Sequence, residues 1–163
     1  MERPTAVTPR RFEAQDLEPL QRLVHLTIDS SYAGLYPPRA VAYFRELYSL
    51  QQILDRQAAG EIVVVECDGA LVATGAIVAA EISGVFVHPQ LQRRGIGAQV
   101  MDVLERHAQA AGHESVHLAV SLPSRRFYES RGYRMLEPCS IDVGEGERLD
   151  YWKAEKSLGA GES

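Results

Sequence analysis

Apolar positions at helical spacing mark the first third of the chain. They recur every three or four residues, at Leu17, Leu20, Leu23, Val24 and Ile28. This spacing predicts a first helix, and Asp16 is expected to cap it by accepting from the free amides of its first turn. Ser30–Pro38, which contains a glycine and two prolines, ends that helix. Two shorter patterns predict helices over residues 41–48 and 50–54, with Ser49 as the N-cap between them.

Later in the chain the pattern changes to the β-branched and alternating runs that are typical of strands. Asp68-Gly69 is a strong hairpin signal because both residue types accept a positive φ angle. Pro9 confines the first strand to a sheet edge or a strand start. Two more helices are indicated, over Gly97–Ala111 and Pro123–Arg131. The predicted strands are Val7–Phe12, Glu61–Cys67, Leu71–Val78, Glu81–His88, Val116–Ser121, Tyr133–Val143 and Arg148–Lys156.

The predicted order of elements is β-α-α-β-β-β-α-β-α-β-β, in which three consecutive strands form an antiparallel meander. A meander combined with crossover helices predicts an α/β or α+β sheet with helices on both faces. The 163 residues correspond to one domain in size. We expect that domain to span residues 1–157, followed by a frayed tail over residues 158–163.

Composition and charge narrow the class of protein. Hydrophobic residues make up 45% and charged residues 24%, which is typical of a soluble globular protein rather than a disordered segment. The net charge of −5 argues against broad binding to nucleic acid or to an anionic membrane. Without a long apolar run or a signal-peptide core, the protein is expected to be cytoplasmic. Cys67 and Cys139 are expected to be buried free thiols, and no metal site is expected.

The most informative segment is Val85–Ala98, with the sequence V-F-V-H-P-Q-L-Q-R-R-G-I-G-A. It is predicted to be a strand end, a loop with two glycines and a helix start. Helix N-termini offer unpaired amides and a positive dipole end, so this turn is a candidate anion site to which Arg93 and Arg94 add charge. A Walker loop would require a lysine, and none is present in this segment. A dinucleotide fingerprint would require glycine or alanine where Val100 stands.

Two short motifs carry a family resemblance. Val87, Pro89, Gln92, Gly95 and Gly97 match the pattern V-x-P-x-x-Q/R-x-x-G-x-G/A, and Phe127–Tyr133 matches F-Y-E-x-x-G-F/Y. Together they resemble the GNAT superfamily of N-acetyltransferases and cover about residues 61–133 in the expected order. The first sixty residues and the final hairpin resemble the family only in their order of elements.

The resemblance implies a GNAT-like fold, with a mixed, mostly antiparallel central sheet of about seven strands, and acetyl-CoA as the donor. In that family the pantetheine arm pairs with the strand before the loop, here Val85, Phe86 and Val87. The alternative to a coenzyme A site is that residues 85–98 form an ordinary glycine-rich turn with solvated arginines. That alternative does not explain why the second motif is also present. The amides implied in pyrophosphate binding are those of Gln92, Arg93, Arg94, Gly95, Ile96, Gly97 and Ala98.

Tyr128 stands at the position of the family's general acid, which protonates the departing CoA thiolate or holds its sulfur. A phenol with an ordinary pKa of about 10 is protonated at neutral pH and is able to donate. The alternative is that Phe127 and Tyr128 are aromatic packing on a short helix. We prefer that alternative for Phe127 and the family role for Tyr128.

An amine acceptor is mostly protonated at pH 7, so a base must accept a proton before attack. Glu81 is the candidate, since some family members carry a catalytic glutamate 14 residues before the first motif glycine. A regular strand would place Glu81, Ser83, Val85 and Val87 on one face, whereas a bulge at Gly84 would break this parity. Two alternatives stay open: Glu81 is a solvated turn residue, or an ordered water accepts the proton.

The chain departs from the family pattern at Ser121 and Ser124, where many members carry asparagine and alanine. Ser121 is still able to hydrogen-bond the pantetheine or an ordered water, but its reach is shorter than that of asparagine. Both serines are retained as candidate cofactor-binding residues.

The acceptor site is expected between the first two helices, their connecting loop and the final hairpin. Tyr32 and Tyr36 lie in that loop, which is a natural lid; a loop that caps the core is the equal alternative. The predicted function is transfer of an acetyl group to a primary amine, by direct attack in a ternary complex. Small amines, amino acids, antibiotics and protein N-termini all remain candidate acceptors, although the acidic net charge favours a cationic amine.

Fold alone leaves another class of function open. The alternative to an enzyme is a non-catalytic acyl-CoA-binding sensor or regulatory module on the same fold. A homodimer through the final strands is a further prediction, because an exposed edge strand invites pairing with a second chain.

Overall fold

The computed structural model describes residues 7–159, and within them seven strands form one sheet in the order β1-β2-β3-β4-β5-β7-β6. Neighbouring strands are antiparallel except for β4 and β5, which are parallel. The sheet is therefore mixed and mostly antiparallel, as predicted. Its strands are β1 (Thr8–Arg11), β2 (Glu61–Cys67), β3 (Ala70–Val78), β4 (Glu81–Val87), β5 (Ser115–Ser121), β6 (Arg134–Gly144) and β7 (Glu147–Ser157).

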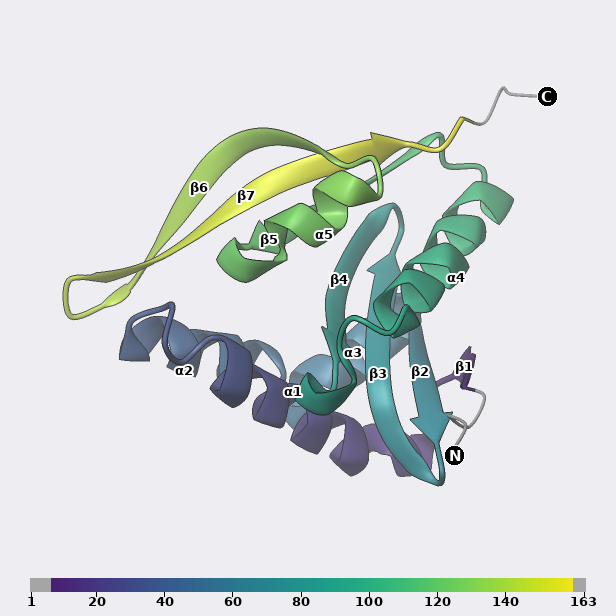
Figure 1. The fold of residues 1–163 in the computed structure, drawn as a ribbon, viewed down its shortest axis with the longest axis horizontal. Coiled ribbons are helices and arrows are strands. Elements are labelled where there is room, and N and C mark those ends of the chain that lie inside the picture. The colour runs from purple at the N-terminus through teal and green to yellow at the C-terminus, as the bar shows by residue number, and fades with distance from the viewer. Residues whose placement is uncertain (1–6, 160–163) are drawn as a thin grey trace.

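Helices cover both faces of the sheet (Figure 1). One face carries α1 (Leu17–Ser31), α2 (Pro38–Leu47) and α3 (Leu50–Ala59). The other carries α4 (Ile96–Ala110) and α5 (Arg125–Ser130). The second helix begins earlier than its apolar pattern because Pro38 occupies the first turn, where a missing N–H is tolerated.

The residues of β2 show how one strand supplies two cores. Val63 and Val65 pack with α4 on one face of the sheet, whereas Ile62 and Val64 pack with α1 and α3 on the other. All four side chains are buried. Full burial of such an aliphatic side chain stabilises a fold by about 1.5–3 kcal/mol relative to exposure. The apolar run therefore reads as a central strand that is covered on both sides.

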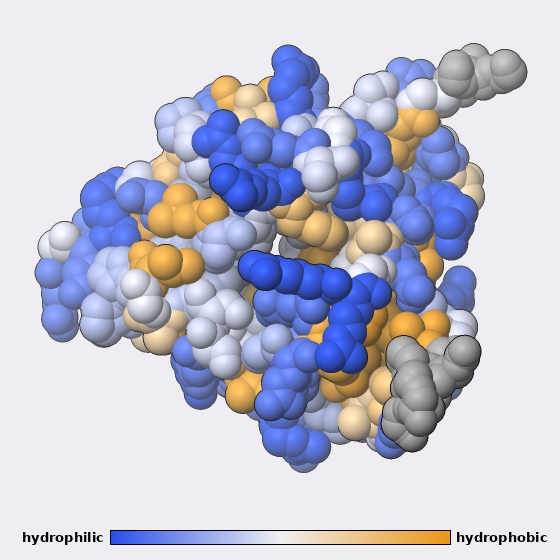
Figure 2. Space-filling model, in the orientation of Figure 1, coloured by the Kyte–Doolittle hydropathy of each residue, from blue (hydrophilic) through white to orange (hydrophobic). Residues whose placement is uncertain are grey.

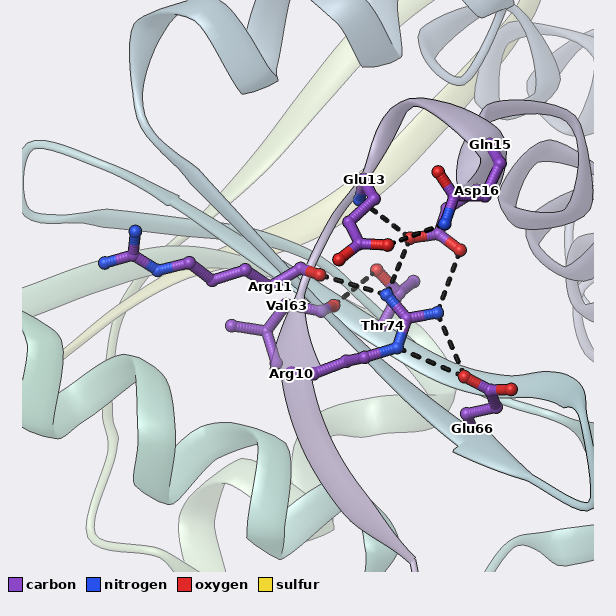
Figure 3. A network of polar contacts seen from close by, with 8 residues as sticks. All are labelled: Arg10, Arg11, Glu13, Gln15, Asp16, Val63, Glu66 and Thr74. Carbon is purple, nitrogen blue, oxygen red and sulfur yellow. Dashed lines mark hydrogen bonds and ion pairs between the residues drawn. The ribbon is translucent and has the colours of Figure 1, made fainter.

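The predicted capping role of Asp16 is wrong. Its carboxylate accepts from the amide of Glu13 at 2.8 Å and from the guanidinium of Arg10 at 2.9 and 3.0 Å, and it caps no amide of α1 (Figure 3). A short 3-10 turn, Ala14–Asp16, comes between β1 and α1 and turns this carboxylate back toward the sheet. Arg10 also contacts Glu66 on β2, so the cluster joins β1, β2 and the entry to α1.

Other local predictions are confirmed. Ser49 Oγ accepts from the amide of Gln52 at 3.2 Å and caps α3. Asp68 and Gly69 turn the β2–β3 hairpin with φ angles of 53° and 83°. The two cysteines, by contrast, are half-buried rather than buried. Cys67 is the last residue of β2, and Cys139 lies on β6 in the terminal hairpin.

The C-terminal segment begins with an ordered residue. Leu158, which we expected to fray, donates from its amide to the Glu114 carbonyl at 2.9 Å and accepts from Gln109 Nε2 at 2.7 Å. Residues 160–163 of the predicted tail lie outside the described residues. Among residues 7–159, no helix has the length and apolar character needed to cross a bilayer. The outer strands of the sheet are β1 and β6.

Candidate active site at the divergence of β4 and β5

The strands β4 and β5 pair only at their beginnings. Glu81 lies opposite His117 and Ile82 opposite Leu118, and no later residues of the two strands are partners. Each strand nevertheless continues for several residues, to Val87 on β4 and to Ser121 on β5. The sheet therefore opens between them. Figure 2 shows a hollow at the centre of the view, next to hydrophilic side chains of the loop that leads into α4.

A β-bulge at Gly84 bends β4 where the opening begins. Ser83 pairs with Ala76 and Phe86 with Thr74, so Gly84 and Val85 together face one residue of β3. Gly84 has a φ angle of 64°, which glycine adopts without strain. The bulge is the alternative that we considered to a regular strand, and it breaks the simple alternation along β4.

The edge of β4 beyond the bulge exposes backbone hydrogen-bonding groups to the opening. The amide of His88 bonds to Val72 at 2.8 Å, so in this antiparallel ladder Phe86 is the next residue to bond to β3. The N–H and C=O groups of Val85 and Val87 consequently point away from β3, toward the gap. Gln92 Nε2 donates to the carbonyl of Val87 at 3.0 Å.

The loop after β4 ends in an uncapped helix N-terminus. Gly95 precedes α4 with a φ angle of 84° and provides no side-chain cap. Within residues 7–159, the amides of Ile96, Gly97 and Ala98 donate no hydrogen bond. These amides and the positive end of the 15-residue helix form a site suited to an anion.

Two glycines leave the backbone of this turn accessible, and two arginine side chains add positive charge beside it. A Cβ added at Gly95 would contact nothing within 4 Å, so the backbone there is open to a ligand. At Gly97 an added Cβ would lie 3.4 Å from the ring of Phe127, which supports the packing role that we preferred for Phe127. Arg93 and Arg94 are exposed and have no ion-pair partner in the described part of the chain.

A cavity of about 270 Å³ opens where the two strands diverge. It is lined by residues of β4, of β5, β6 and β7, and of the side of the sheet that carries α1, α2 and α3. Seven of the residues that we predicted for donor binding, catalysis or acceptor binding contribute to its wall: Tyr32, Glu81, Val85, Phe86, Ser121, Ser124 and Tyr128. The cavity wall therefore includes Val85 and Phe86 of the strand edge, and the chain continues from that edge through the loop to the anion site at the start of α4.

Tyr128 reaches this cavity from α5. Its ring packs edge-on against Phe127 and Tyr133, with centroid distances of 5.0 and 5.5 Å. Its hydroxyl forms no hydrogen bond with any residue from 7 to 159. Burial, with lesser effects of Tyr32 and Tyr48, raises the pKa of Tyr128 above the usual range of a phenol. The hydroxyl is therefore protonated at neutral pH and available to donate.

The family is decided by a match over most of the chain. Residues 21–133 match the model of the acetyltransferase (GNAT) family. The chain belongs to the GNAT family.

Solved structures resemble this GNAT chain over nearly its full length. A GCN5-related N-acetyltransferase from Rhodopseudomonas palustris has a TM-score of 0.85 and 19% identity, covering 96% of this chain and 99% of its own. The PaiA N-acetyltransferase from Thermoplasma acidophilum, solved in complex with coenzyme A, has a TM-score of 0.75 and 19% identity over 94% and 99%. An alanine N-acetyltransferase of a ribosomal protein from Escherichia coli has a TM-score of 0.70 and 17% identity over 94% of both chains. At these identities the likeness shows the fold.

The two serines that replace the common GNAT residues are joined to the α1–α2 loop. Tyr32 donates from its hydroxyl to Ser121 Oγ at 3.0 Å, and Ser121 Oγ shares a hydrogen bond of 2.8 Å with Ser124 Oγ. Burial raises the pKa of Tyr32 to about 12, so this hydroxyl also stays protonated. A chain of three hydroxyls consequently borders the cavity at the end of β5.

Tyr36 lies outside this cavity lining. Its hydroxyl donates to the carbonyl of Asp150 at 3.2 Å and accepts from the amide of Leu122 at 2.8 Å. The side chain is buried among residues of the α1–α3 core. The core-capping alternative therefore describes Tyr36, while Tyr32 is both buried and part of the cavity wall.

Glu81 lies at the beginning of β4 and contributes to the cavity wall. Its side chain is exposed, and its carboxylate forms no hydrogen bond or ion pair with the described residues. It is thus free to interact with a ligand or with water. Because β4 has a bulge at Gly84, strand alternation does not determine whether Glu81 and Val85 lie on the same face. The bend in β4 sets their relative position.

Several lining residues did not enter the predicted site. They come from α2, the residue that follows it, α3 and the β6–β7 hairpin, and include Tyr43, Phe44, Tyr48, Arg56 and Tyr151. A helical pattern with aromatic residues at 43, 44 and 48 was visible in the sequence. Nothing local distinguished these aromatic side chains from ordinary core residues.

Within residues 7–159, no group of three or more histidine, cysteine, aspartate or glutamate side chains is arranged to hold a metal ion.

Proposed function

We propose that this GNAT-family chain is an N-acetyltransferase that transfers an acetyl group from acetyl-CoA to a primary amine. Attack occurs directly, with donor and acceptor bound together. One observation carries the proposal: the free edge of β4 is followed, after a 3-10 turn (Pro89–Leu91) and a short loop, by the uncapped N-terminus of α4. Such an edge suits an extended amide-containing arm, and such a helix end suits a diphosphate.

The residues around this path fit coenzyme A. Val85, Phe86 and Val87 would hold the pantetheine arm as an added strand, through the backbone groups of the two valines. The amides of residues 92–98 would bind the pyrophosphate, and Arg93 and Arg94 would supplement its charge balance. Ser121, at the end of β5, and Ser124, in the turn that follows, would contact the arm from the other side of the gap. The complex of the Thermoplasma acidophilum protein with coenzyme A supports this assignment by fold similarity.

Tyr128 is assigned the role of general acid. Acetyl-CoA supplies an activated acetyl group and a thiolate leaving group. The Oη atom of Tyr128 has no protein partner and carries a proton at neutral pH, so it is able to donate that proton at the sulfur. Solvent then reprotonates the phenol.

The amine nitrogen must lose one proton as it forms the new amide bond. The carboxylate of Glu81 would accept that proton directly or through an ordered water at the cavity mouth. Its lack of a competing protein partner supports the assignment. Because the free amine arises from an ammonium ion, the nitrogen releases two protons in all, one before attack and one as the amide bond forms. The sulfur receives one proton, and the other is released to solvent.

Thermal unfolding with and without acetyl-CoA tests donor binding. A ligand at 100 times its dissociation constant should raise the melting temperature of a domain of this size by roughly 5–11 °C. Release of free thiol in the presence of amines then tests turnover and separates an enzyme from a non-catalytic acyl-CoA-binding module. Donor binding with no thiol release for any amine would contradict the proposed activity.

A further inference from the structure

The part of the cavity that faces α2 and the terminal hairpin has an apolar wall. We use that name for Tyr43, Phe44 and Leu47 on α2 together with Ile141, Leu149 and Tyr151 on the hairpin. These six side chains include no charged group, and three of them are aromatic. Two of them, Tyr43 and Tyr151, also carry a hydroxyl group. The wall therefore favours a ligand body that is mostly apolar.

The apolar wall is held together by contacts between its two parts. The β6–β7 hairpin reaches over α2 (Figure 1), where the amide of Arg39 donates to Glu147 Oε1 at 2.8 Å. The guanidinium of Arg39 also donates to the carbonyl of Val143 at 3.3 Å. These bonds fix the hairpin against the start of α2, so the wall is a built feature of the fold.

Among residues 7–159, two formally charged side chains line the cavity, Glu81 and Arg56. The guanidinium of Arg56 lies 4.2 Å above the ring of Tyr48, and its Nη1 donates to the carbonyl of Leu47 at 3.0 Å. It forms no ion pair with any carboxylate among residues 7–159. A guanidinium has five N–H donors, so most of its hydrogen-bonding capacity is unused. A half-buried cation without a counter-ion is suited to an anionic group of a ligand.

This charge distribution disfavours acceptors that carry several positive charges. A polyamine or an aminoglycoside would need several carboxylates, whereas the cavity has Glu81 alone and an opposing Arg56. The preference for a cationic amine suggested by the net charge of −5 is therefore not reproduced inside the cavity. Its volume of about 270 Å³ is at the low end for ligand pockets and calls for a compact acceptor.

We propose that the acceptor is a free amino acid with an aromatic or branched aliphatic side chain. Its α-carboxylate would bind Arg56, its side chain would contact the apolar wall, and its α-amine would face Glu81 and the thioester. This inference rests on the proposed acetyltransferase function. It adds a carboxylate requirement that the general function does not contain.

Matched acceptors isolate the carboxylate. Thiol release is measured with L-phenylalanine, L-leucine, L-phenylalaninamide, phenethylamine and spermidine. The value of kcat/KM for L-phenylalanine should exceed that for L-phenylalaninamide by about 10-fold or more, because the neutral amide leaves the guanidinium unpaired. The amine of the amide is the less basic of the two, so its larger unprotonated fraction works against the expected result.

Substitution of Arg56 tests whether this residue binds the α-carboxylate of the acceptor. In Arg56→Gln, the ratio of kcat/KM for L-phenylalanine to that for L-phenylalaninamide should fall to near one. The ratio is measured on one protein, so general damage to the fold affects both substrates and cancels. Arg45→Gln is the matched control, since Arg45 also lies on this helical face but pairs with the exposed Asp29 at 2.7 Å. The control should keep the ratio of the unmodified chain.

The outcomes separate the two proposals. If phenethylamine, L-phenylalaninamide or spermidine reacts as well as L-phenylalanine, the amino-acid acceptor is overturned while the acetyltransferase function stands. An unchanged ratio in Arg56→Gln also overturns the assignment of Arg56. If no amine in the panel releases thiol, the amino-acid acceptor is overturned. The acetyltransferase function fails only if a wider set of amines and peptide N-termini also releases none while acetyl-CoA binds.

Discussion

The hydroxyl of Tyr32 donates a hydrogen bond of 3.0 Å to Ser121 Oγ, between residues 89 positions apart in the chain. Tyr32 follows the last turn of α1, and Ser121 ends β5. The contact therefore joins the helices on the proposed acceptor side to the strand that borders the proposed donor path. It crosses the region where the sheet itself is open.

Substitution Tyr32→Phe should weaken this connection. The change removes one part-buried hydrogen bond and leaves the ring in place, so the free energy of unfolding should fall by about 1 kcal/mol. Urea unfolding measures the effect. Tyr43→Phe is the control, because the Tyr43 hydroxyl has no protein partner within residues 7–159. Equal decreases in the free energy of unfolding for the two variants would show that the Tyr32–Ser121 hydrogen bond does not stabilise the fold.

Substitution Tyr128→Phe should affect turnover rather than stability. The hydroxyl makes no protein hydrogen bond, so the melting temperature and the affinity for acetyl-CoA should change little. Loss of a general acid should lower kcat about 100-fold. Steady-state kinetics and calorimetric titration with acetyl-CoA separate the two effects. A variant with unaltered kcat would remove Tyr128 from the mechanism.

Substitution Glu81→Gln tests whether the Glu81 carboxylate takes part in removing the proton. If the Glu81 carboxylate accepts the proton, kcat at neutral pH should fall by about 100-fold, and raising the pH should recover part of the rate by deprotonating the amine in solution. The pH profile of kcat/KM for both proteins measures this. A profile identical to that of the unmodified chain would assign proton removal to an ordered water.

Glu105 is the centre of a cluster that supports α5. It accepts from the hydroxyl of Tyr133 at 2.7 Å, from Lys156 at 2.9 Å and from Arg131 at 3.2 Å. Glu105→Gln should lower the free energy of unfolding by about 2 kcal/mol, because it leaves the partly buried Lys156 without a carboxylate and leaves Arg131 with Asp102 alone. Chemical denaturation of Glu129→Gln provides the control, since its pair with Arg125 is exposed and should contribute about 0.5 kcal/mol or less. Similar losses in both variants would contradict the importance of the cluster.

The Arg10–Asp16 contact predicts a pH dependence of stability. The hydrogen bonds from the Arg10 guanidinium hold the pKa of the Asp16 carboxyl below its ordinary value of 3.8. Because the folded pKa is the lower one, the contact stabilises the fold fully above pH about 4, and this stabilisation is lost as the pH falls through the folded pKa. The difference in unfolding free energy between the unmodified chain and Asp16→Asn should therefore shrink on acidification below pH about 4. A constant difference down to pH 2 would contradict this linkage.

Local signals in the sequence were sufficient for much of the fold. The Asp68-Gly69 turn, the Ser49 cap and the Gly84 bulge each depend on the conformational preferences of residues at that position. The candidate donor path could also be predicted, because its strand, loop and helix start are contiguous in the chain. Such features do not depend on how distant segments meet.

The remaining features depend on contacts between distant segments. Tyr36 bonds to Asp150 and Leu122, which are 114 and 86 positions away, so its packing role had no local signature. The apolar wall forms only when the terminal hairpin docks on α2. The local sequence around Asp16 is typical of a helix N-cap. In the structure, however, the 3-10 turn and the contact with Arg10 direct its carboxylate toward β2.

A crystal structure of the protein with coenzyme A would test the central claim most directly. The pantetheine arm should lie between β4 and β5, hydrogen-bonded to the backbone of Val85 or Val87, with the diphosphate on the amides at the start of α4. Coenzyme A bound elsewhere on the molecule, with these amides solvated, would contradict it.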